Sequence, residues 1–437
     1  MKILIIADDL SGAADCAIGF ADAGHRTIVM LEAMQDGADL RADTVAIDTD
    51  TRRMPAAEAA ARTTAAYTTL RVEGQRLYKK IDSTLRGSWA ADVAALQRLA
   101  GLAVVAPAFP ATGRTLRGGR VLVHGEPLEN TETWQLENLD READVAAMLA
   151  DAGLTTQVLD AEALRDDVGA LAAQIETIAT SGVQALVVDA QTEHALRTLA
   201  LATLYTETAL FWVGSGGLAR EIASLISRQG QRMNASEETG SPPIPSGGEM
   251  KAPILVMVGS LSAVSSRQSA ILRASCDIEE LIVPPAVLRE GAGHAQWAAL
   301  GARIGETLAA GSDLLLRIGR DDAFDPAEGA QLSAALAALV GPHFEKARGL
   351  IATGGETARA MLCAARIGAL QLMAEVEPGV AIGKPLGANG EHCPRIVTKA
   401  GAFGTDNALY SAWLRVRHEA ASSERSVDGR KTTSLKA

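Results

Sequence analysis

Short apolar runs alternate with longer amphipathic stretches along most of the chain. The first apolar run, Lys2–Ala7, ends directly at two aspartates, which is typical of a buried strand followed by a turn. Residues 13–23, after that turn, carry apolar side chains at helical spacing. A strand that leads at once into a helix is the repeating unit of a parallel sheet covered by helices.

The same alternation continues through the first half of the chain. Further strands are predicted at 27–31, Thr44–Asp48, 76–81, Leu102–Ala106, Thr156–Leu159, 185–189 and Leu210–Gly214. Helices are predicted at 55–71, 90–99 and 218–229. The pattern therefore predicts an α/β fold in which helices flank a largely parallel sheet.

The alternation is interrupted at 230–252. These residues are rich in Gly, Ser, Pro and polar side chains without periodicity, so they are predicted to form a linker. Strands resume at 254–259, 278–283, 313–318 and Gly349–Thr353, and a helix is predicted at 357–366. We therefore predict two α/β domains, at 1–229 and 253–417, followed by a disordered tail at 418–437.

Composition and charge narrow the classes of function. The net charge of −12 opposes nonspecific binding to nucleic acid or anionic membranes, so we expect neither as a partner. The four cysteines have no CxxC spacing and the seven histidines form no HxH or HxxxH pair, which makes zinc and disulfide sites weak hypotheses. No apolar run approaches the ~20 residues of a membrane span, and the start is unlike a signal peptide. We therefore expect a cytoplasmic protein.

Two turns that follow predicted strands of the first domain concentrate charge, and ligands of open α/β sheets bind at such strand ends. Asp8 and Asp9 follow the first strand. One of them is explained as a helix N-cap, whereas the second points to a substrate hydroxyl, an oriented nucleophile or a metal. Arg52 and Arg53 follow the strand Thr44–Asp48 and suit a carboxylate, although a solvated turn explains them equally well.

A third charged turn follows the strand predicted at 76–81. Lys80, Ile81, Asp82 and Ser83 place a cation, a carboxylate and a hydroxyl beside a buried strand. Such groups are costly to bury unless each has a partner, and a small acid with several hydroxyls would supply those partners. The three turns therefore predict a pocket for a small anionic substrate. The proline-rich segment 107–114 either borders the same pocket or has a structural role.

One glycine-rich turn, at 214–219, matches the G-x-G-x-x-A spacing of a dinucleotide site. It lacks the second strand that would carry an acidic residue about 20 positions further on, so tight packing of strand against helix is the favoured interpretation. An NAD-dependent dehydrogenase is the alternative that this turn leaves open. The sequence contains neither the G-x-x-x-x-G-K-[ST] motif nor the signature set of protein kinases.

The corresponding turns of the second domain are rich in glycine and hydroxyl groups. The turn that opens the helix at 357–366 presents backbone N–H groups and the positive end of a helix, which suit a phosphate. The candidate phosphate-binding residues are Ser260, Gly354, Gly355, Glu356, Thr357, Lys399 and Gly401. Charged turns in one domain and glycine turns in the other predict two ligands that meet in the interdomain cleft.

Six motifs in order resemble those of the four-carbon acid sugar kinases, a family that includes kinases of D-threonate, D-erythronate and 3-oxo-tetronate. The motifs are IADDLSGAAD at 6–15, KKIDSTLRG at 79–87, APAFPATGRT at 106–115, VGSLS at 258–262, TGGETA at 353–358 and KAGAFG at 399–404. The resemblance spans nearly the whole chain. It implies that the first domain binds a sugar acid and the second binds ATP.

The resemblance also implies contacts for particular residues. Substrate contacts are expected from Asp9, from Arg52 or Arg53, and from 80–83, and ATP contacts from Ser260, 354–357 and Gly401. The turns themselves add Asp8 to the first set and Lys399 to the second. The chain departs from the family pattern at Ser11, where threonine is common, at His124, where an acidic residue is expected, and in having two adjacent arginines.

We therefore predict phosphoryl transfer from ATP to the C4 hydroxyl of a four-carbon sugar acid. D-threonate, converted to 4-phospho-D-threonate in sugar acid catabolism, is the first expectation, with D-erythronate and 3-oxo-tetronate as alternatives. Arg52, Arg53 and Lys80 are expected to hold the carboxylate, and Asp9 or Asp82 to bind hydroxyls or orient the attacking one. Mg²⁺ is expected to bridge the phosphates, with ligands that the sequence does not identify. A homodimer is expected from the resemblance, and a noncatalytic regulator that senses a small acid is the alternative from another class.

Overall fold

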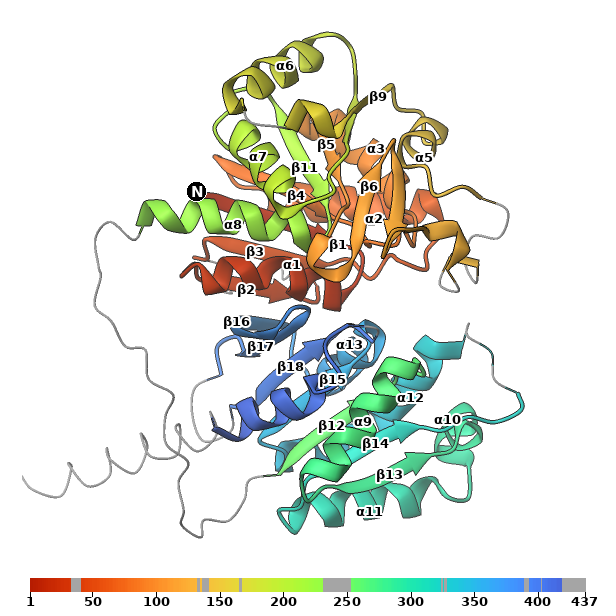
Figure 1. Cartoon of the computed structure of the whole chain (residues 1–437). Helices are drawn as coiled ribbons and strands as arrows, with labels where there is room; N and C mark the ends of the chain where they lie inside the picture. The colour runs from red at the N-terminus through yellow and green to blue at the C-terminus, as the bar shows by residue number, and fades with distance from the viewer. Residues whose placement is uncertain are drawn as a thin grey trace, which may run out of the picture. The chain divides into compact units, whose positions relative to one another are not determined.

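The computed structural model describes residues 1–32, 41–131, 134–135, 141–164, 167–230, 253–323, 325, 328–388, 393–401 and 403–418 (Figure 1). The chain divides into two compact units, Met1–Asn234 and Ala235–Ala437, in agreement with a two-domain α/β fold. Residues 231–252 of the predicted linker and 419–437 of the predicted tail lie outside the described residues. The predictions for those two segments stay predictions.

The sheet of unit 1 is parallel. In spatial order its strands are β2 (Thr27–Met30), β3 (Thr44–Asp48), β1 (Lys2–Ala7), β4 (Gln75–Lys80), β11 (Leu210–Gly214), β5 (Leu102–Ala106), β10 (Ala185–Val188) and β9 (Thr156–Leu159). β1 lies between β3 and β4 and is buried from Ile3 onwards, which explains its continuous apolar sequence.

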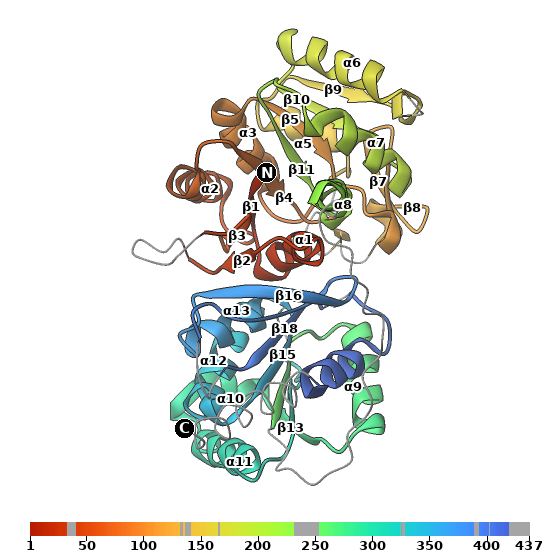
Figure 2. The same cartoon turned by 90° about the vertical axis from the view of Figure 1, so that its left-hand side faces the viewer.

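Helices cover both faces of this sheet (Figure 2). One layer consists of α1 (Leu10–Asp22), α8 (Gly216–Gly230), α7 (Glu193–Leu204) and α6 (Val168–Thr180), each packed on the next. The other layer consists of α2 (Ala56–Leu70), α3 (Trp89–Ala100) and α5 (Val145–Asp151), also packed in that order. The strands predicted for this unit are confirmed to within one residue at each end.

Helix α1 begins at Leu10, three residues before the predicted start. The reason is Asp9, whose carboxylate accepts a hydrogen bond from the Gly12 backbone N–H at 3.0 Å and so caps the first turn. The structural interpretation of one aspartate as an N-cap is therefore correct for Asp9.

A small antiparallel sheet of β6 (Arg114–Arg117), β7 (Arg120–Val123) and β8 (Glu126–Pro127) was not predicted. Its strands are too short to show a clear alternation. The turn between β6 and β7 is attached to the main sheet of unit 1 by the buried Asp189. The carboxylate of Asp189 accepts hydrogen bonds from the backbone N–H groups of Gly118 and Gly119. The segment after Pro110 thus forms a hairpin fixed to the end of β10.

The sheet of unit 2 is mixed. In spatial order its strands are β13 (Glu279–Val283), β14 (Leu314–Ile318), β12 (Ile254–Val258), β15 (Gly349–Thr353), β18 (Arg395–Lys399), β17 (Val380–Pro385) and β16 (Ala369–Glu377). The pairs among β13, β14, β12 and β15 are parallel, as predicted. β18, which was not predicted, is parallel to β15, whereas β17 is antiparallel to both β18 and β16.

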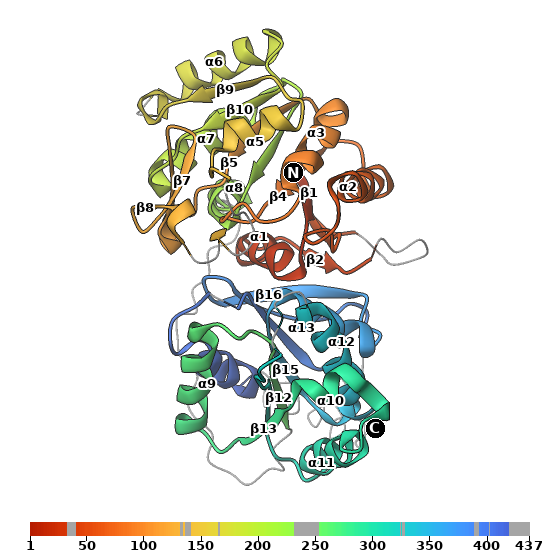
Figure 3. The ribbon, with the colours of Figure 1, turned by 90° about the vertical axis from the view of Figure 1, so that its right-hand side faces the viewer.

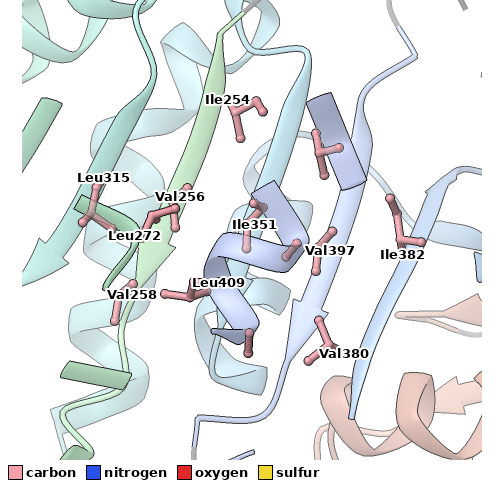
Figure 4. Packing of buried hydrophobic residues seen from close by; sticks show 13 residues of the cluster. Ile254, Val256, Val258, Leu272, Leu315, Ile351, Val380, Ile382, Val397 and Leu409 are labelled. Atoms are coloured by element: carbon pink, nitrogen blue, oxygen red, sulfur yellow. The ribbon is translucent and has the colours of Figure 1, made fainter. Parts of the chain in front are cut away.

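Helices again form two layers (Figure 3). One contains α10 (Pro285–Glu290), α11 (Trp297–Ala309), α12 (Gly329–Val340) and α13 (Gly355–Ala364). The other contains α9 (Ala263–Ser275) and the helical residues 408–418. Figure 4 shows the core under this second layer, where Leu272 and Leu409 pack on Val256, Ile351 and Val397, all five almost completely buried. Among the described helices, none combines the length and apolar character that crossing a membrane requires.

Candidate active site

The charged turns of unit 1 meet because their strands are neighbours. β3, β1 and β4 run parallel side by side, so the turns that follow them leave the same edge of the sheet. There Arg52 donates from Nε to Asp8 Oδ2 at 2.9 Å and from Nη2 to Asp8 Oδ1 at 2.8 Å. The same Nη2 donates to Asp9 Oδ1 at 2.6 Å. One arginine of one turn thus fixes both carboxylates of another.

Lys80 brings a second cation to the same turn. It is the last residue of β4 and is only 5% exposed. A methyl group at Gly12 would collide with both Lys80 Nζ and Asp9 Oδ1, so these two atoms lie directly over the glycine. Within the described part of the chain, Lys80 Nζ has no hydrogen-bond or ion-pair partner. The ammonium group therefore keeps its capacity to bind an anion.

Asp82 is held by its own turn. Arg86 donates from Nε to Oδ2 and from Nη2 to Oδ1, both at 2.9 Å. The Thr84 backbone N–H donates to Oδ2 at 3.1 Å, and the Thr84 hydroxyl contacts the same oxygen. Both oxygens of this carboxylate are thus engaged within the protein.

Ion pairing keeps the two buried aspartates ionised. Burial by itself would raise the pKa of Asp8, but Arg52, with Lys80 and Lys79, outweighs it and the pKa lies below its usual value. For Asp82 burial is likewise outweighed, here by Arg86 and Arg52, and the pKa lies well below its usual value. A carboxylate with a strongly lowered pKa accepts a proton poorly, so Asp82 is unsuited to act as a general base.

Asp9 is placed differently from these two. Its Oδ1 accepts from Gly12 and Arg52, whereas its Oδ2 has no partner among the described residues. Its side chain is 19% exposed, compared with 4% for Asp8 and 9% for Asp82. Asp9 is therefore the aspartate of this site with an oxygen available to a ligand.

The other residues predicted to bind substrate, Ile81, Ser83 and Arg53, differ in their burial and in their contacts. Ile81 is fully buried, and its N–H donates to the Gly214 carbonyl at 2.8 Å, so it joins β4 to β11. Ser83 is 5% exposed and lies in the Asp82 turn. Arg53 is exposed, whereas its neighbour Arg52 is brought to Asp8 and Asp9.

Two arginines outside the predicted set of substrate contacts, although within segments that the sequence pointed to, also belong to this region. Arg86 is the partner of Asp82, and its place in the motif at 79–87 was the available signal. Arg114, at the start of β6, is affected by the charges of Asp82 and Arg86, although burial is the largest influence and lowers its pKa. The proline-rich segment therefore leads to a hairpin whose first residue lies near the charged turn of Asp82 and Arg86.

The glycine-rich turn at 214–219 packs closely against the end of β5. A side chain at Gly217 would collide with the Ala108 carbonyl, and one at Gly216 would collide with Phe109 and Asp15. Contact with the protein's own backbone explains these glycines, in line with the packing interpretation.

The glycine turns of unit 2 also follow neighbouring parallel strands, β12, β15 and β18. Ser262 and Ser265, from the turn after β12 and the first turn of α9, donate to the Gly401 carbonyl at 3.2 and 2.8 Å. A methyl group at Gly401 would collide with Ser260 Oγ. The structure thus brings together Ser260 and Gly401, two of the predicted nucleotide-binding residues.

The turn after β15 joins the same group. Gly354 has φ of 93°, a conformation that favours glycine, and serves as N-cap of α13 without any side chain capping that helix in the described structure. This φ explains why α13 begins at Gly355, two residues before the predicted start. The Gly354 N–H donates to the Lys399 carbonyl at 2.8 Å, and Thr357 Oγ1 lies 3.0 Å from Ser333 Oγ. The positive end of α13 is therefore available to an anion.

Lys399, the last residue of β18, is fully buried. Its ammonium group donates to the carbonyls of Ala400, Gly401 and Phe403 at 2.9, 3.1 and 2.8 Å. Burial lowers its pKa to about 8. Lys399 is therefore attached to the loop on which Gly401 lies.

Two family models match this chain, one within each of its two units. The family model described as sugar-binding N-terminal domain matches residues 3–222, and the model described as nucleotide-binding C-terminal domain matches residues 255–409. The D-threonate kinase of Cupriavidus necator is 54% identical over 427 residues, which cover 97% of this chain and 100% of the relative. The D-threonate kinase of Bordetella bronchiseptica is 32% identical and covers 94% of this chain and 97% of its own length.

More distant relatives carry other names, among them a D-erythronate kinase of Heliobacterium modesticaldum at 27% identity and a 3-oxo-tetronate kinase of Methylobacterium radiotolerans at 30%. Among solved structures, a Salmonella typhimurium LT2 protein superposes with a TM-score of 0.76 at 22% identity, covering 94% of this chain and 98% of its own. This likeness shows a shared fold over the whole chain.

Proposed function

This chain belongs to the four-carbon acid sugar kinase family, and we propose that it transfers the γ-phosphate of ATP to the C4 hydroxyl of D-threonate, giving 4-phospho-D-threonate and ADP. The observation that carries the proposal is the pair of sites at strand ends. Unit 1 presents the buried ammonium of Lys80 beside fixed carboxylates, and unit 2 presents the N-terminus of α13 beside Ser260 and Gly401. The first arrangement suits a hydroxy acid and the second a polyphosphate.

In this proposal Lys80 binds the substrate carboxylate. It is the buried cation of the pocket whose donors no described residue uses. Arg52 binds Asp8 and Asp9 and so holds their oxygens in place for the substrate hydroxyls. Ser83 adds a hydroxyl at the same strand end, Ile81 contributes through the backbone, and Arg53 contributes charge from the exposed side of its turn.

Asp9 is proposed to accept the proton of the reacting hydroxyl. The C4 oxygen attacks the γ-phosphorus, the bond from that phosphorus to the bridging oxygen of ADP breaks, and the hydroxyl proton passes to Asp9 Oδ2. The attack needs little covalent help, because positioning and charge stabilisation supply most of the catalysis of phosphoryl transfer. The reaction requires the phosphate held by unit 2 to reach the hydroxyl held by unit 1.

The nucleotide is proposed to lie on the glycine turns of unit 2, with its polyphosphate at 354–357 and its other parts beside Ser260 and Gly401. Within the described residues, no three His, Cys, Asp or Glu side chains form a metal cluster. That arrangement fits Mg²⁺ entering with ATP, since Mg²⁺ keeps several waters and binds substrate phosphates with one or two carboxylates. Asp9, whose Oδ2 no described residue binds, and Glu356, in the first turn of α13, are carboxylates that would hold such an ion. When bound, Mg²⁺ would neutralise phosphate charge.

We further propose that the protein is a homodimer and is located in the cytoplasm.

The two alternatives from other functional classes, a dehydrogenase and a noncatalytic regulator, have less support. The turn at 214–219, which suggested a dehydrogenase, is filled by contacts within unit 1. A noncatalytic regulator would not turn over ATP, so an activity assay separates it from a kinase.

The test is an ADP-release assay with ATP, Mg²⁺ and, in separate reactions, D-threonate, L-threonate, D-erythronate and 3-oxo-tetronate. We expect the highest kcat/KM with D-threonate, and phosphorus NMR of the product should show a monoester at C4. A higher kcat/KM with another acid would identify that acid as the preferred substrate. The absence of acid-dependent ADP with all four acids would refute the kinase proposal. NAD⁺ reduction with the same acids would support a dehydrogenase.

A further inference from the structure

The loop after β18 uses all three protons of the Lys399 ammonium. They go to the carbonyls of Ala400, Gly401 and Phe403, and the lysine side chain has no exposed surface. A lysine ammonium has three donors and no acceptor. An ammonium engaged in this way has no proton left for a phosphate oxygen.

These inward carbonyls determine where the loop's amide groups point. In a trans peptide the N–H points opposite to the C=O, and the described chain contains no cis peptide bond. The Ala400 carbonyl points to Lys399, so the Gly401 N–H points away from it. Within the described residues that N–H has no acceptor, and Gly401 lies against Ser260.

Side chains of α9 and the turn before it hold the same loop from another direction. Ser262 and Ser265 donate to the Gly401 carbonyl, which Lys399 also binds. Gln268 Nε2 donates to the Phe403 carbonyl at 3.1 Å. The carbonyl oxygens of the loop are therefore drawn into the protein, and an outward amide remains for an anion.

We propose that Lys399 is a positioning residue of the nucleotide site, whose ammonium holds the loop carbonyls inward so that the Gly401 N–H faces the polyphosphate. Lys399 itself does not touch the phosphates, in contrast to the direct contact that the sequence suggested. The inference rests on the proposed binding of ATP to unit 2. Through the Gly354 N–H, which donates to the Lys399 carbonyl, the same residue also joins this loop to the start of α13.

The test compares the wild type with Lys399→Met and with the control Lys384→Met, a half-buried lysine on β17 of the same unit. ATP and D-threonate affinities are measured by calorimetry, and amide exchange is measured in nucleotide-free protein. We expect Lys399→Met to weaken ATP binding about tenfold or more and to speed exchange at Phe403 and Thr405 before any nucleotide is added. D-threonate affinity and the control variant should be unchanged.

A pH series on the wild type provides a second measurement that needs no variant to fold. The pKa of Lys399 is about 8, so its ammonium loses its proton as pH rises through that value, and ATP affinity should fall between pH 7 and 9. Glu377 of β16 is the charged group that acts on Lys399. The surrounding Ser262, Ser265 and Gln268 do not titrate.

The outcomes separate the inference from the function on which it rests. Weakened ATP binding with unchanged amide exchange would make Lys399 a direct phosphate ligand and overturn the inference. An unchanged ATP affinity in Lys399→Met, or a flat wild-type pH profile, would overturn it as well. A wild type that does not bind ATP at all would instead contradict the proposed function, while the exchange data would still report whether Lys399 orders the loop.

Discussion

The three aspartates at the ends of β1 and β4 differ in how many of their oxygens the protein itself engages. Arg52 occupies both oxygens of Asp8, and Arg86 with Thr84 occupies both oxygens of Asp82. Only one oxygen of Asp9 is used among the described residues. This difference separates residues that shape the pocket from one that can take part in proton transfer.

Replacing Asp9 by asparagine should lower kcat by about 10² to 10⁴, the range in which a positioned acid or base contributes. The amide still accepts from Gly12, so KM for the acid should change little. Asp82→Asn removes a charge that Arg86 needs, and we expect it to raise KM more than it lowers kcat. Steady-state kinetics of both variants is the measurement.

The changes in kcat and KM of these two variants show which aspartate accepts the proton of the reacting hydroxyl. A large loss of kcat at unchanged KM in Asp82→Asn, with normal turnover in Asp9→Asn, would exchange their roles. Thermal unfolding of each variant provides the control, because an unfolded turn would raise KM without informing on catalysis.

For individual residues, the positions of the charged turns could be predicted from the sequence, but the ion pairs within them could not. Whether Arg52 or Arg53 enters the site depends on which side of the turn each side chain leaves, and that follows from tertiary contacts with Asp8. Lys399 illustrates the same limit, because its glycine-rich surroundings suggested a phosphate ligand before its three carbonyl partners were known.

Among the elements, the central parallel strands were predictable because burial on both faces makes their sequences continuously apolar. β16 was not predicted, since most of its residues are only half buried and charged residues interrupt its pattern. The β6 to β8 sheet was missed for a different reason. Its strands depend on contacts such as that with Asp189, which no local pattern contains.

The helical residues 408–418 are attached to the sheet of unit 2 by one buried carboxylate. Asp313 accepts from the Ile254 N–H at 2.8 Å, from Trp413 Nε1 at 2.7 Å and from Arg417 Nη2 at 2.6 Å. Arg417 also lies over the Trp413 ring, 5.3 Å from its centroid. The start of β12 and the last described helix thus share one anchor.

Asp313→Ala should lower the free energy of unfolding of unit 2 by about 3–5 kcal/mol, because it leaves a partly buried guanidinium, a buried backbone N–H and a partly buried indole N–H without their acceptor. Asp406→Ala is the matched control. Its pair with Arg267 is more than half exposed on both sides, so its loss should cost less than about 1 kcal/mol. Amide exchange of the unit 2 peptides over a urea series measures both, and equal effects would contradict the anchoring role.

For the whole molecule, each unit has its own core and its own strand-end site. D-threonate should therefore slow amide exchange at 8–12 and 80–87, and ATP should slow it at 354–358 and 399–405. At a ligand concentration of about 100 times Kd, each stabilises the native state by about 2.7 kcal/mol. Exchange mass spectrometry with each ligand alone is the measurement, and protection of the unit 1 turns by ATP alone would reverse the assignment.

The separation of the two sites by unit has an evolutionary consequence. Under the proposed assignment, mutations in the turns after β1, β3 and β4 would alter the acceptor site alone, because these turns lie in unit 1 and share no strand with the turns of unit 2. Named relatives differ in the acid they phosphorylate and agree in being kinases. If the proposed assignment holds, a lineage acquires a new acceptor through a few changes in its first 230 residues while it inherits the other unit intact.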